Sequence, residues 1–363
     1  MKIGKTKLIK QNIAPLGATN VVLFNSDNEI VCEMSLGHLA IPNNGDRMYS
    51  FLALSDVHQP YETALADHQK ALSYASNSDE IDFVIETGDL TSTGRENEMQ
   101  DWKACVDAYL PDKPMYAITG NHENYSARIE TYTLSDYTGH PLYYSFLHGD
   151  DIFIMVGCYG WYEGDTIPPD NILTIEELQW LYETLEENRN RRCFVCFHVL
   201  PWGDCGNAAG LYTYNLFTGT KCQVFLSLIQ HYKNVILFHG HSHLRYELQE
   251  IDKKANYSES NGYKSVHISS LAVPRDANAS LDGYDEIFAE SEGYVVDVYK
   301  NGIHLRAMNF VTENFIPIAS YWVDTTLETV QACSYVDATG TIITNTKAVS
   351  GIAVAGRTIS GYY

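Results

Sequence analysis

Short runs of apolar residues alternate with amphipathic stretches through the middle of the chain. The runs have the length and composition of buried strands, and they occupy residues 49–55, 82–87, 115–119, 151–157, 192–197 and 234–238. Stretches with helical spacing lie between them, at about residues 61–76, 95–109, 174–189 and 221–232. Strands that alternate with helices predict an α/β fold.

Local signals mark one helix start and one hairpin. Thr174, followed by Glu177 three residues later, is a capping-box pattern for the helix at 174–189. Asn301-Gly302 lies between two alternating runs within residues 293–310, which is typical of a tight hairpin. A hairpin pairs its strands antiparallel, whereas strand–helix alternation gives parallel strands, so we expect mixed sheets.

The two ends of the chain have a different pattern. Residues 18–41 predict two strands around the turn Ser26-Asp27-Asn28, and residues 319–363 are rich in Thr, Val, Ile, Tyr and Gly. These ends could complete the central domain as edge strands, or they could attach it to a larger assembly. We predict three segments: a β-rich segment at 1–47, a central domain at 48–318 and a β-rich segment at 319–363.

Charge and composition exclude several classes of protein. The 363 residues include 24 basic and 46 acidic side chains, a net charge of −22. Proteins that bind nucleic acid or anionic membranes need clustered positive charge, so we expect neither partner. No apolar run approaches the roughly 18 residues of a membrane span, and no secretory signal is visible. The cysteines, including Cys193 and Cys196 in an apolar run, predict reduced thiols and a cytoplasmic location. The oligomeric state stays open.

Residues that bind metals follow five of the predicted strands directly. In chain order they are Asp56 and His58, Asp89, Asn121 and His122, His198, and His241 and His243. The carboxyl ends of strands form the sites of open α/β sheets, so these side chains should converge. Imidazole and carboxylate together suit Zn, Mn and Fe, and a carboxylate can bridge two ions about 3.5–4 Å apart. Glycines precede Asp89, Asn121 and His241 and permit tight turns and close backbone approach.

The order D-x-H, G-D, G-N-H-E, H, G-H-x-H resembles the calcineurin-like metallophosphoesterase superfamily over about residues 48–310. The spacings of 33 residues from Asp56 to Asp89 and 32 from Asp89 to Asn121 each suit one strand–helix unit. The resemblance implies a four-layered α/β/β/α sandwich with mixed sheets. It also implies a dinuclear centre, with Mn, Fe or Zn as the metals.

The same resemblance implies a role for each of these residues. The ligands of the first metal would be Asp56, His58, Asp89 and His243. The ligands of the second would be Asp89, Asn121, His198 and His241, with Asp89 bridging. His122 would contact the phosphate and protonate the leaving oxygen, with Asn121 beside it in the catalytic set. A hydroxide that bridges the metals would attack phosphorus in line.

Departures from known patterns narrow the branch of the superfamily. Its protein Ser/Thr phosphatases carry an Asp-Arg-Gly run shortly after the Gly-Asp, which is lacking here in GDLTSTGRENEM. Its purple acid phosphatases place a Tyr three residues after that Asp, where this chain has Ser92. The remaining pattern is most similar to the class III cyclic-nucleotide phosphodiesterases and the broad phosphodiesterase branch. We therefore expect a phosphodiesterase, with the choice between monoesters and diesters left open.

The substrate is expected to be a small phosphoester. Only Asp56 and Asp89 of the 46 acidic residues are predicted ligands, so most of the negative charge lies on the surface and would repel long polyanions. The loop at 201–220 follows His198 and is rich in glycine and aromatic residues. Its Trp202, Tyr212 and Tyr214 could stack a base or sugar of the substrate, or could pack among themselves.

Two other functions stay open at this stage. The chain could be a metal-binding structural or assembly module that keeps the fold but has little turnover. Its N-terminal stretch resembles what precedes phosphoesterase domains in some phage-associated proteins, so association with a phage particle is one form of this hypothesis. The chain could also be a metal-dependent hydrolase of a non-phosphate ester. The predicted role of His122 fits phosphate better.

Overall fold

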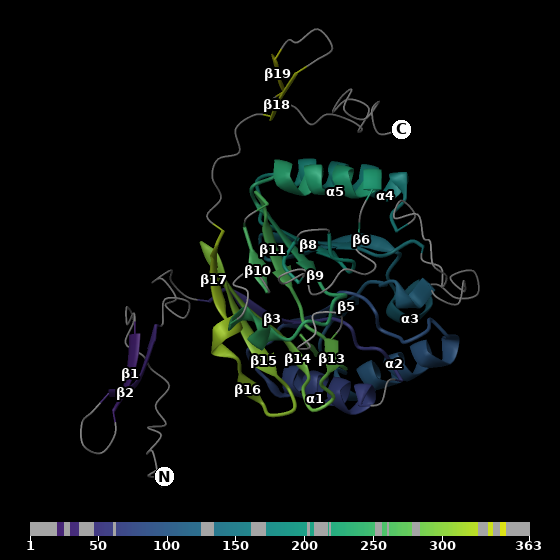
Figure 1. Cartoon of the computed structure of the whole chain (residues 1–363). Helices are drawn as coiled ribbons and strands as arrows, with labels where there is room; N and C mark the ends of the chain where they lie inside the picture. The colour runs from purple at the N-terminus through teal and green to yellow at the C-terminus, as the bar shows by residue number, and fades with distance from the viewer. Residues whose placement is uncertain are drawn as a thin grey trace.

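Two β-sheets packed face to face, with helices on both outer faces, form the centre of the computed structural model (Figure 1). The structure describes residues 20–24, 30–35, 47–60, 63–124, 134–160, 172–201, 204–206, 217, 219–250, 256–259, 261–277, 284–325, 333–336 and 342–345. The layers run helix, sheet, sheet, helix. This arrangement confirms the predicted four-layered α/β/β/α sandwich.

The first sheet combines three parallel strands with an antiparallel group. Its order is β16-β15-β14-β3-β4-β5, and β17 also pairs with β15. The parallel strands are β3 (Tyr49–Leu54), β4 (Phe83–Glu86) and β5 (Met115–Ala117). The antiparallel strands are β14 (Glu292–Tyr299), β15 (Gly302–Asn309), β16 (Asn314–Phe315) and β17 (Tyr321–Asp324). The predicted β14–β15 hairpin is present, but it turns at Lys300-Asn301, one residue before the predicted Asn301-Gly302, because Gly302 pairs with Tyr299.

The second sheet has four parallel strands between two antiparallel edges. Its order is β10-β11-β9-β8-β7-β6. The parallel strands are β7 (Asp151–Val156), β8 (Cys193–Phe197), β9 (Val235–His239) and β11 (Lys264–His267). The edges are β6 (Tyr143–His148) and β10 (Tyr257–Ser258). Both sheets are mixed, which confirms the expectation.

Aromatic side chains fill the space between the two sheets. Phe51 and Phe83 of the first sheet stack with ring centroids 5.2 Å apart. Phe153 and Phe194 of the second sheet stack at 4.6 Å, and Phe153 meets Phe51 edge-on at 5.2 Å. Such pairs typically add about 0.5–1.5 kcal/mol beyond the area they bury. Each of these strands is also buried on its other face, which explains its continuous apolar run.

The helices cover the sheets in pairs. α1 (Ala64–Asn77) and α2 (Glu96–Tyr109) pack on the first sheet, and α4 (Ile175–Glu187) and α5 (Gly219–His231) pack on the second (Figure 1). The predicted capping box of α4 is present. The Glu177 backbone N–H donates to Thr174 Oγ1 at 3.0 Å, and the Thr174 N–H donates to Glu177 Oε2 at 2.6 Å.

Shorter elements complete the described part of the chain. They are α3 (Leu134–Thr138), the 3₁₀ turns η1 (His122–Asn124), η4 (Tyr246–Glu250) and η5 (Pro317–Ala319), and the paired strands β12 (Arg275–Ala277) and β13 (Tyr284–Glu286). Among the described residues, no helix has the length and apolar character needed to cross a membrane.

The strand pair predicted within residues 18–41 is present, and the β-rich C-terminal segment also contains a strand pair. β1 (Asn20–Phe24) pairs antiparallel with β2 (Ile30–Ser35), and β18 (Cys333–Val336) pairs antiparallel with β19 (Ile342–Asn345). β17, which belongs to the segment 319–363, joins the first sheet through β15. The division of the chain at residues 47 and 318 stays a prediction.

Candidate metal centre

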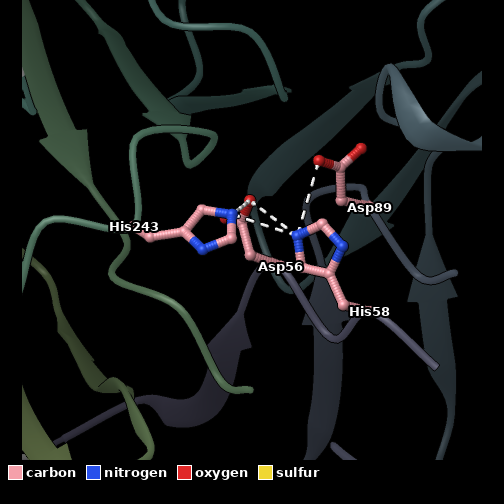
Figure 2. Close-up of side chains that lie close together, drawn as sticks. All are labelled: Asp56, His58, Asp89 and His243. Atoms are coloured by element: carbon pink, nitrogen blue, oxygen red, sulfur yellow. Dashed lines mark hydrogen bonds and ion pairs between the residues drawn. The ribbon is translucent and has the colours of Figure 1, made fainter. Parts of the chain in front are cut away.

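The loops that follow β3, β4, β8 and β9 bring buried Asp and His side chains into two overlapping groups. In each group, the potential ligand atoms all lie within 4.8 Å of one another. Figure 2 shows the first group, which is Asp56, His58, Asp89 and His243. The second group is Asp89, His198 and His241. Asp89 is the member that both groups share, as its predicted bridging role requires.

The backbone orients both carboxylates. Asp56 Oδ2 accepts a hydrogen bond from the His241 N–H at 2.9 Å, which leaves Oδ1 at 2.9 Å from His243 Nε2. Asp89 Oδ1 accepts from the His122 N–H at 2.9 Å. In each residue, one oxygen is held by an amide and the other faces imidazole nitrogens. The oxygen that faces inward is therefore positioned before any ligand arrives.

Asp89 Oδ2 lies at the centre of the cluster. It is 3.0 Å from His198 Nε2 and 3.8 Å from both His58 Nε2 and His122 Nε2. One carboxylate oxygen thus meets imidazoles from three different loops. Such a position suits a ligand that two cations share.

Backbone carbonyls determine which ring nitrogen carries the proton in His198 and His243. His198 Nδ1 donates to the Thr87 carbonyl at 2.9 Å, and His243 Nδ1 donates to the Val273 carbonyl at 3.2 Å. A neutral imidazole with its proton on Nδ1 presents a lone pair at Nε2. Nε2 of His198 therefore faces the carboxylate of Asp89, where it can hold either a proton or a metal ion.

Facing lone pairs repel one another unless a proton or a metal cation lies between them. Asp56 Oδ1 and His198 Nε2 are buried and make no hydrogen bond, although both lie close to other polar atoms. Nε2 of His243 also lies 3.0 Å from Nε2 of His58. These donors fit metal ions, since carboxylate oxygen and imidazole nitrogen are their usual ligands.

Protonation states in the cluster also suit metal binding. Burial lowers the pKa of His241 and of His243 to about 3, so both rings are neutral at pH 7. Burial alone would raise the pKa of Asp56 and Asp89, but the surrounding imidazoles hold both pKa values well below the ordinary one. For His198, burial lowers the pKa, and the two carboxylates outweigh it and raise the pKa to about 9. A cation at this position would replace that proton.

The backbone is strained at five of the predicted ligands. A positive φ in a residue other than glycine is uncommon, typically costs about 1–2 kcal/mol, and clusters at functional sites. Among the described residues, the non-glycine positions with positive φ are these five and Glu313. The five are Asp56 at 54°, His58 at 50°, Asp89 at 51°, His241 at 80° and His243 at 60°.

Two of the predicted glycines lie against the carboxylates. A Cβ atom on Gly240 would lie 2.0 Å from Ser55 Oγ and 2.4 Å from Asp56 Oδ2. A Cβ atom on Gly120 would lie 2.1 Å from Asp89 Oδ1. Contacts this short cannot form without displacement, so the expected close backbone approach is confirmed at both positions.

His122 has a different environment from the other imidazoles. Its side chain is 25% exposed, whereas those of His58, His198 and His243 are at most 5% exposed. Its Nδ1 donates to the Ser92 carbonyl at 2.6 Å, which fixes the ring with Nε2 at 3.8 Å from Asp89 Oδ2. Burial lowers the pKa of His122 to about 4, although Asp89 opposes this effect. The ring therefore lies at the edge of the cluster.

Glu123 is a structural member of the site to which the sequence assigned no role. Its Oε1 accepts from the backbone N–H and the hydroxyl of Thr91, each at 2.8 Å, and its Oε2 accepts from the Gly120 N–H at 2.6 Å. The carboxylate thus joins the loop after β4 to the loop after β5. Burial, with the charge of Asp89, raises the pKa of Glu123 to about 7. Its place in the G-N-H-E run was the available signal.

The sequence also predicts Asn121 and three aromatic residues as members of the site. Asn121 is 1% exposed and begins the turn after β5, beside His122. Its roles as a metal ligand and in catalysis stay predictions. Trp202, Tyr212 and Tyr214 lie outside the described residues. Their stacking on a substrate also stays a prediction.

A model of the calcineurin-like phosphoesterase family matches residues 49–245, just over half of the chain. No curated protein matches the chain. Among solved structures, the chain is similar to a conserved uncharacterised protein of Streptococcus pneumoniae TIGR4, described as a predicted phosphoesterase. The two are 10% identical with a TM-score of 0.36, and the match covers 76% of this chain and 97% of that one.

Two further solved structures are vacuolar protein sorting 29 proteins. That of Cryptosporidium parvum is 12% identical, with a TM-score of 0.36, and the match covers 77% of this chain and 100% of that one. The Entamoeba histolytica protein, complexed with Zn²⁺, is 11% identical, with a TM-score of 0.34. The match covers 76% of this chain and 99% of that one.

Proposed function

Because the chain belongs to the calcineurin-like phosphoesterase family, we propose that it is a metal-dependent hydrolase of a small phosphoester, with a phosphodiester as the preferred substrate. Two transition-metal ions would occupy the overlapping groups that share Asp89. The observation that carries the proposal is the approach of Asp89 Oδ2 to imidazole nitrogens of three loops, the nearest at 3.0 Å. Donors so arranged need a proton or a metal cation between them.

The ions would be Mn, Fe or Zn, since each accepts mixed imidazole and carboxylate ligands. When bound, such ions lower the pKa of water toward neutrality and neutralise phosphoryl oxygens. Asp56 and Asp89 supply two negative charges to the cluster, and with metal bound its histidines would be neutral donors. Two divalent ions would therefore leave a locally positive site inside a protein whose net charge is −22. This contrast favours small anionic substrates.

His122 is proposed as the general acid. The Ser92 carbonyl holds Nδ1–H, so a second proton at Nε2 would be presented toward the cluster. The negative charge of a bound phosphoester would raise the pKa of this imidazole from about 4, because an opposite charge nearby favours the protonated form. Nε2 could then protonate the leaving oxygen as its bond to phosphorus breaks.

A panel of phosphoesters tests this function. Full-length protein loaded with Mn²⁺, Fe²⁺ or Zn²⁺ would be assayed with cyclic nucleotides, dinucleotides, glycerophosphodiesters, sugar phosphates and aryl esters. We expect hydrolysis of at least one phosphodiester, faster than that of the matching monoester, and its loss in Asp89→Asn. Hydrolysis of carboxylic esters alone would contradict the proposal.

Two outcomes of the same panel separate the alternatives. Metal occupancy without turnover of any ester would favour the structural or assembly module that the sequence left open. A chain that binds no transition metal under any loading condition would overturn both the hydrolase and the metal-binding module.

A further inference from the structure

A second buried group of metal-binding side chains lies on the outer face of the six-stranded sheet. Asp204, Cys205 and His239 each offer a ligand atom within 4.8 Å of the others, and their exposed fractions are 5%, 1% and 0%. His239 ends β9 two positions after Leu237, whose side chain packs under α4 and α5. It therefore points to the helix side of the sheet. None of the three is a predicted ligand of the catalytic centre.

The separation of sulfur and nitrogen in this group matches a tetrahedral site. Cys205 Sγ lies 3.5 Å from His239 Nε2. Zinc bonds of about 2.3 Å to sulfur and 2.0–2.1 Å to nitrogen, at a tetrahedral angle, place those two atoms about 3.5 Å apart. The hydroxyl of Ser265 faces the same point, at 3.1 Å from His239 Nε2 and 3.4 Å from Cys205 Sγ. Two oxygen ligands, one sulfur and one nitrogen thus face a common point between these residues.

The carboxylate of Asp204 is buried and is held by two hydrogen bonds. Its Oδ2 accepts from the Tyr263 hydroxyl at 2.6 Å, and its Oδ1 accepts from the Cys205 N–H at 2.8 Å. Within the ranges that the structure describes, no Lys, Arg or His side chain forms an ion pair with it. A buried charge without a partner is costly, so such groups are usually paired or coordinate a metal. The two hydrogen bonds also orient the carboxylate, as outer partners of metal ligands do.

We propose that Asp204, Cys205 and His239 bind a structural Zn²⁺ ion, separate from the catalytic centre. Binding would form a bond from Zn²⁺ to Sγ as the S–H bond breaks, and the proton would leave to solvent. Ionised Cys205 and Asp204 then balance the two positive charges, so the buried unit is neutral. The Ser265 hydroxyl supplies the fourth, neutral ligand. The proposal goes beyond phosphoester hydrolysis and does not depend on it.

The site would join three parts of the fold. Asp204 and Cys205 belong to the loop after β8, which begins with the predicted ligand His198. His239 ends β9, and Ser265 lies in β11. Zinc at this position would fix the start of that loop against both strands, beside the catalytic centre. Its role would be to stabilise the fold.

Cobalt gives a test that does not depend on activity. Full-length protein stripped of metal with a chelator would be titrated with Co²⁺, and the thiolate-to-cobalt charge-transfer band would be recorded with the number of ions bound. We expect the wild-type chain to show the band. We expect Cys205→Ser to lose it and to bind about one ion fewer per chain. Zn²⁺ should also raise the Tm of the wild-type chain more than that of Cys205→Ser.

Three matched variants make the result specific. Cys193→Ser changes another buried cysteine, whose Sγ forms hydrogen bonds with two backbone carbonyls and Asn234, so it should keep the band. Asp89→Asn impairs the catalytic centre and should also keep the band, which separates the two sites. His239→Gln should shift or lose it.

The wild-type chain decides the question even if a variant fails to fold. Absence of a thiolate band at cobalt saturation would overturn the proposal and leave a metal-free cluster of hydrogen bonds. A band that persists in folded Cys205→Ser would also overturn it. A band that disappears in Asp89→Asn but not in Cys205→Ser would assign the thiolate to another site.

Discussion

Asp89 Oδ2 and His198 Nε2 lie 3.0 Å apart, yet His198 Nε2 makes no hydrogen bond. His198 Nδ1 is already bonded to the Thr87 carbonyl, so the ring presents Nε2 to the carboxylate. The pair comes from the ends of β4 and β8, which belong to different sheets. A cation between the two residues would therefore also tie the two sheets together at their carboxyl ends.

Replacing Asp89 should remove metal from both halves of the centre. Asp89→Asn keeps the shape of the side chain, and its carbonyl oxygen can still accept from the His122 N–H, but the shared negative charge is lost. We expect kcat to fall more than about 100-fold, since even outer partners of metal ligands typically contribute 10–100-fold. Elemental analysis should show reduced metal content. Asp107→Asn, at an exposed position on α2, is the matched control and should change neither quantity.

Replacing His122 should separate acid catalysis from metal binding. We expect His122→Ala to retain the metals and to lower kcat by about 10²–10⁴-fold, the usual contribution of a general acid. A general acid works when protonated, so wild-type kcat should fall as pH rises through the pKa of His122 in the substrate complex. That alkaline limb should be absent from the variant. If His122→Ala lost metal instead, His122 would be a ligand.

Adding one methyl group at Gly240 should disrupt the first metal group. The new Cβ would lie 2.4 Å from Asp56 Oδ2, so Gly240→Ala should displace the carboxylate from the orientation that the His241 amide gives it. We expect weaker metal binding, measured by titration, with retained secondary structure. Gly139→Ala is the control, because a Cβ there meets nothing within 4 Å despite a positive φ of 75°. Equal metal affinity in the two variants would contradict the geometry.

A buried ion pair below the Asp89 loop should make stability depend on pH. His68 Nε2 lies 2.7 Å from Glu86 Oε1, and the Trp102 indole donates to Glu86 Oε2 at 2.7 Å. Burial opposes the charged imidazole, but Glu86 outweighs it and raises the pKa of His68 to about 10 from an unfolded value of 6.5. The folded state therefore holds the proton more tightly. The pair's contribution is complete below pH 6.5 and is lost as pH rises through 10.

Equilibrium unfolding of wild type and His68→Gln, followed by tryptophan fluorescence, measures this contribution. Breaking a buried pair typically costs about 3–5 kcal/mol, so the variant should be less stable by about that amount at low pH. The gap should narrow as pH rises through the pKa of His68. His231→Gln removes a histidine at the end of α5 whose pKa is lowered by desolvation, so its gap should stay constant as pH rises above 6.5. A His68→Gln gap that stays constant with pH would refute the charged pair.

The sequence by itself determined the main strands and helices, because their burial requires apolar runs and helical spacing. It also located the candidate ligands, because each follows a strand end where α/β folds place their sites. The sequence did not predict β6, because this edge strand is only partly buried and its pattern of apolar residues is weak. Glu123 belongs to the G-N-H-E run, but its hydrogen bonds with Thr91 and Gly120 depend on the packing of two loops.

Only the tertiary structure decided how the donors face one another. The carbonyls that set the tautomers of His198 and His243 lie on other loops, and the left-handed backbone at five ligands is imposed by the turns around them. The approach of Cys205 to His239 joins residues 34 positions apart. No local pattern encodes such a contact, because it arises when β9 and the loop after β8 pack together.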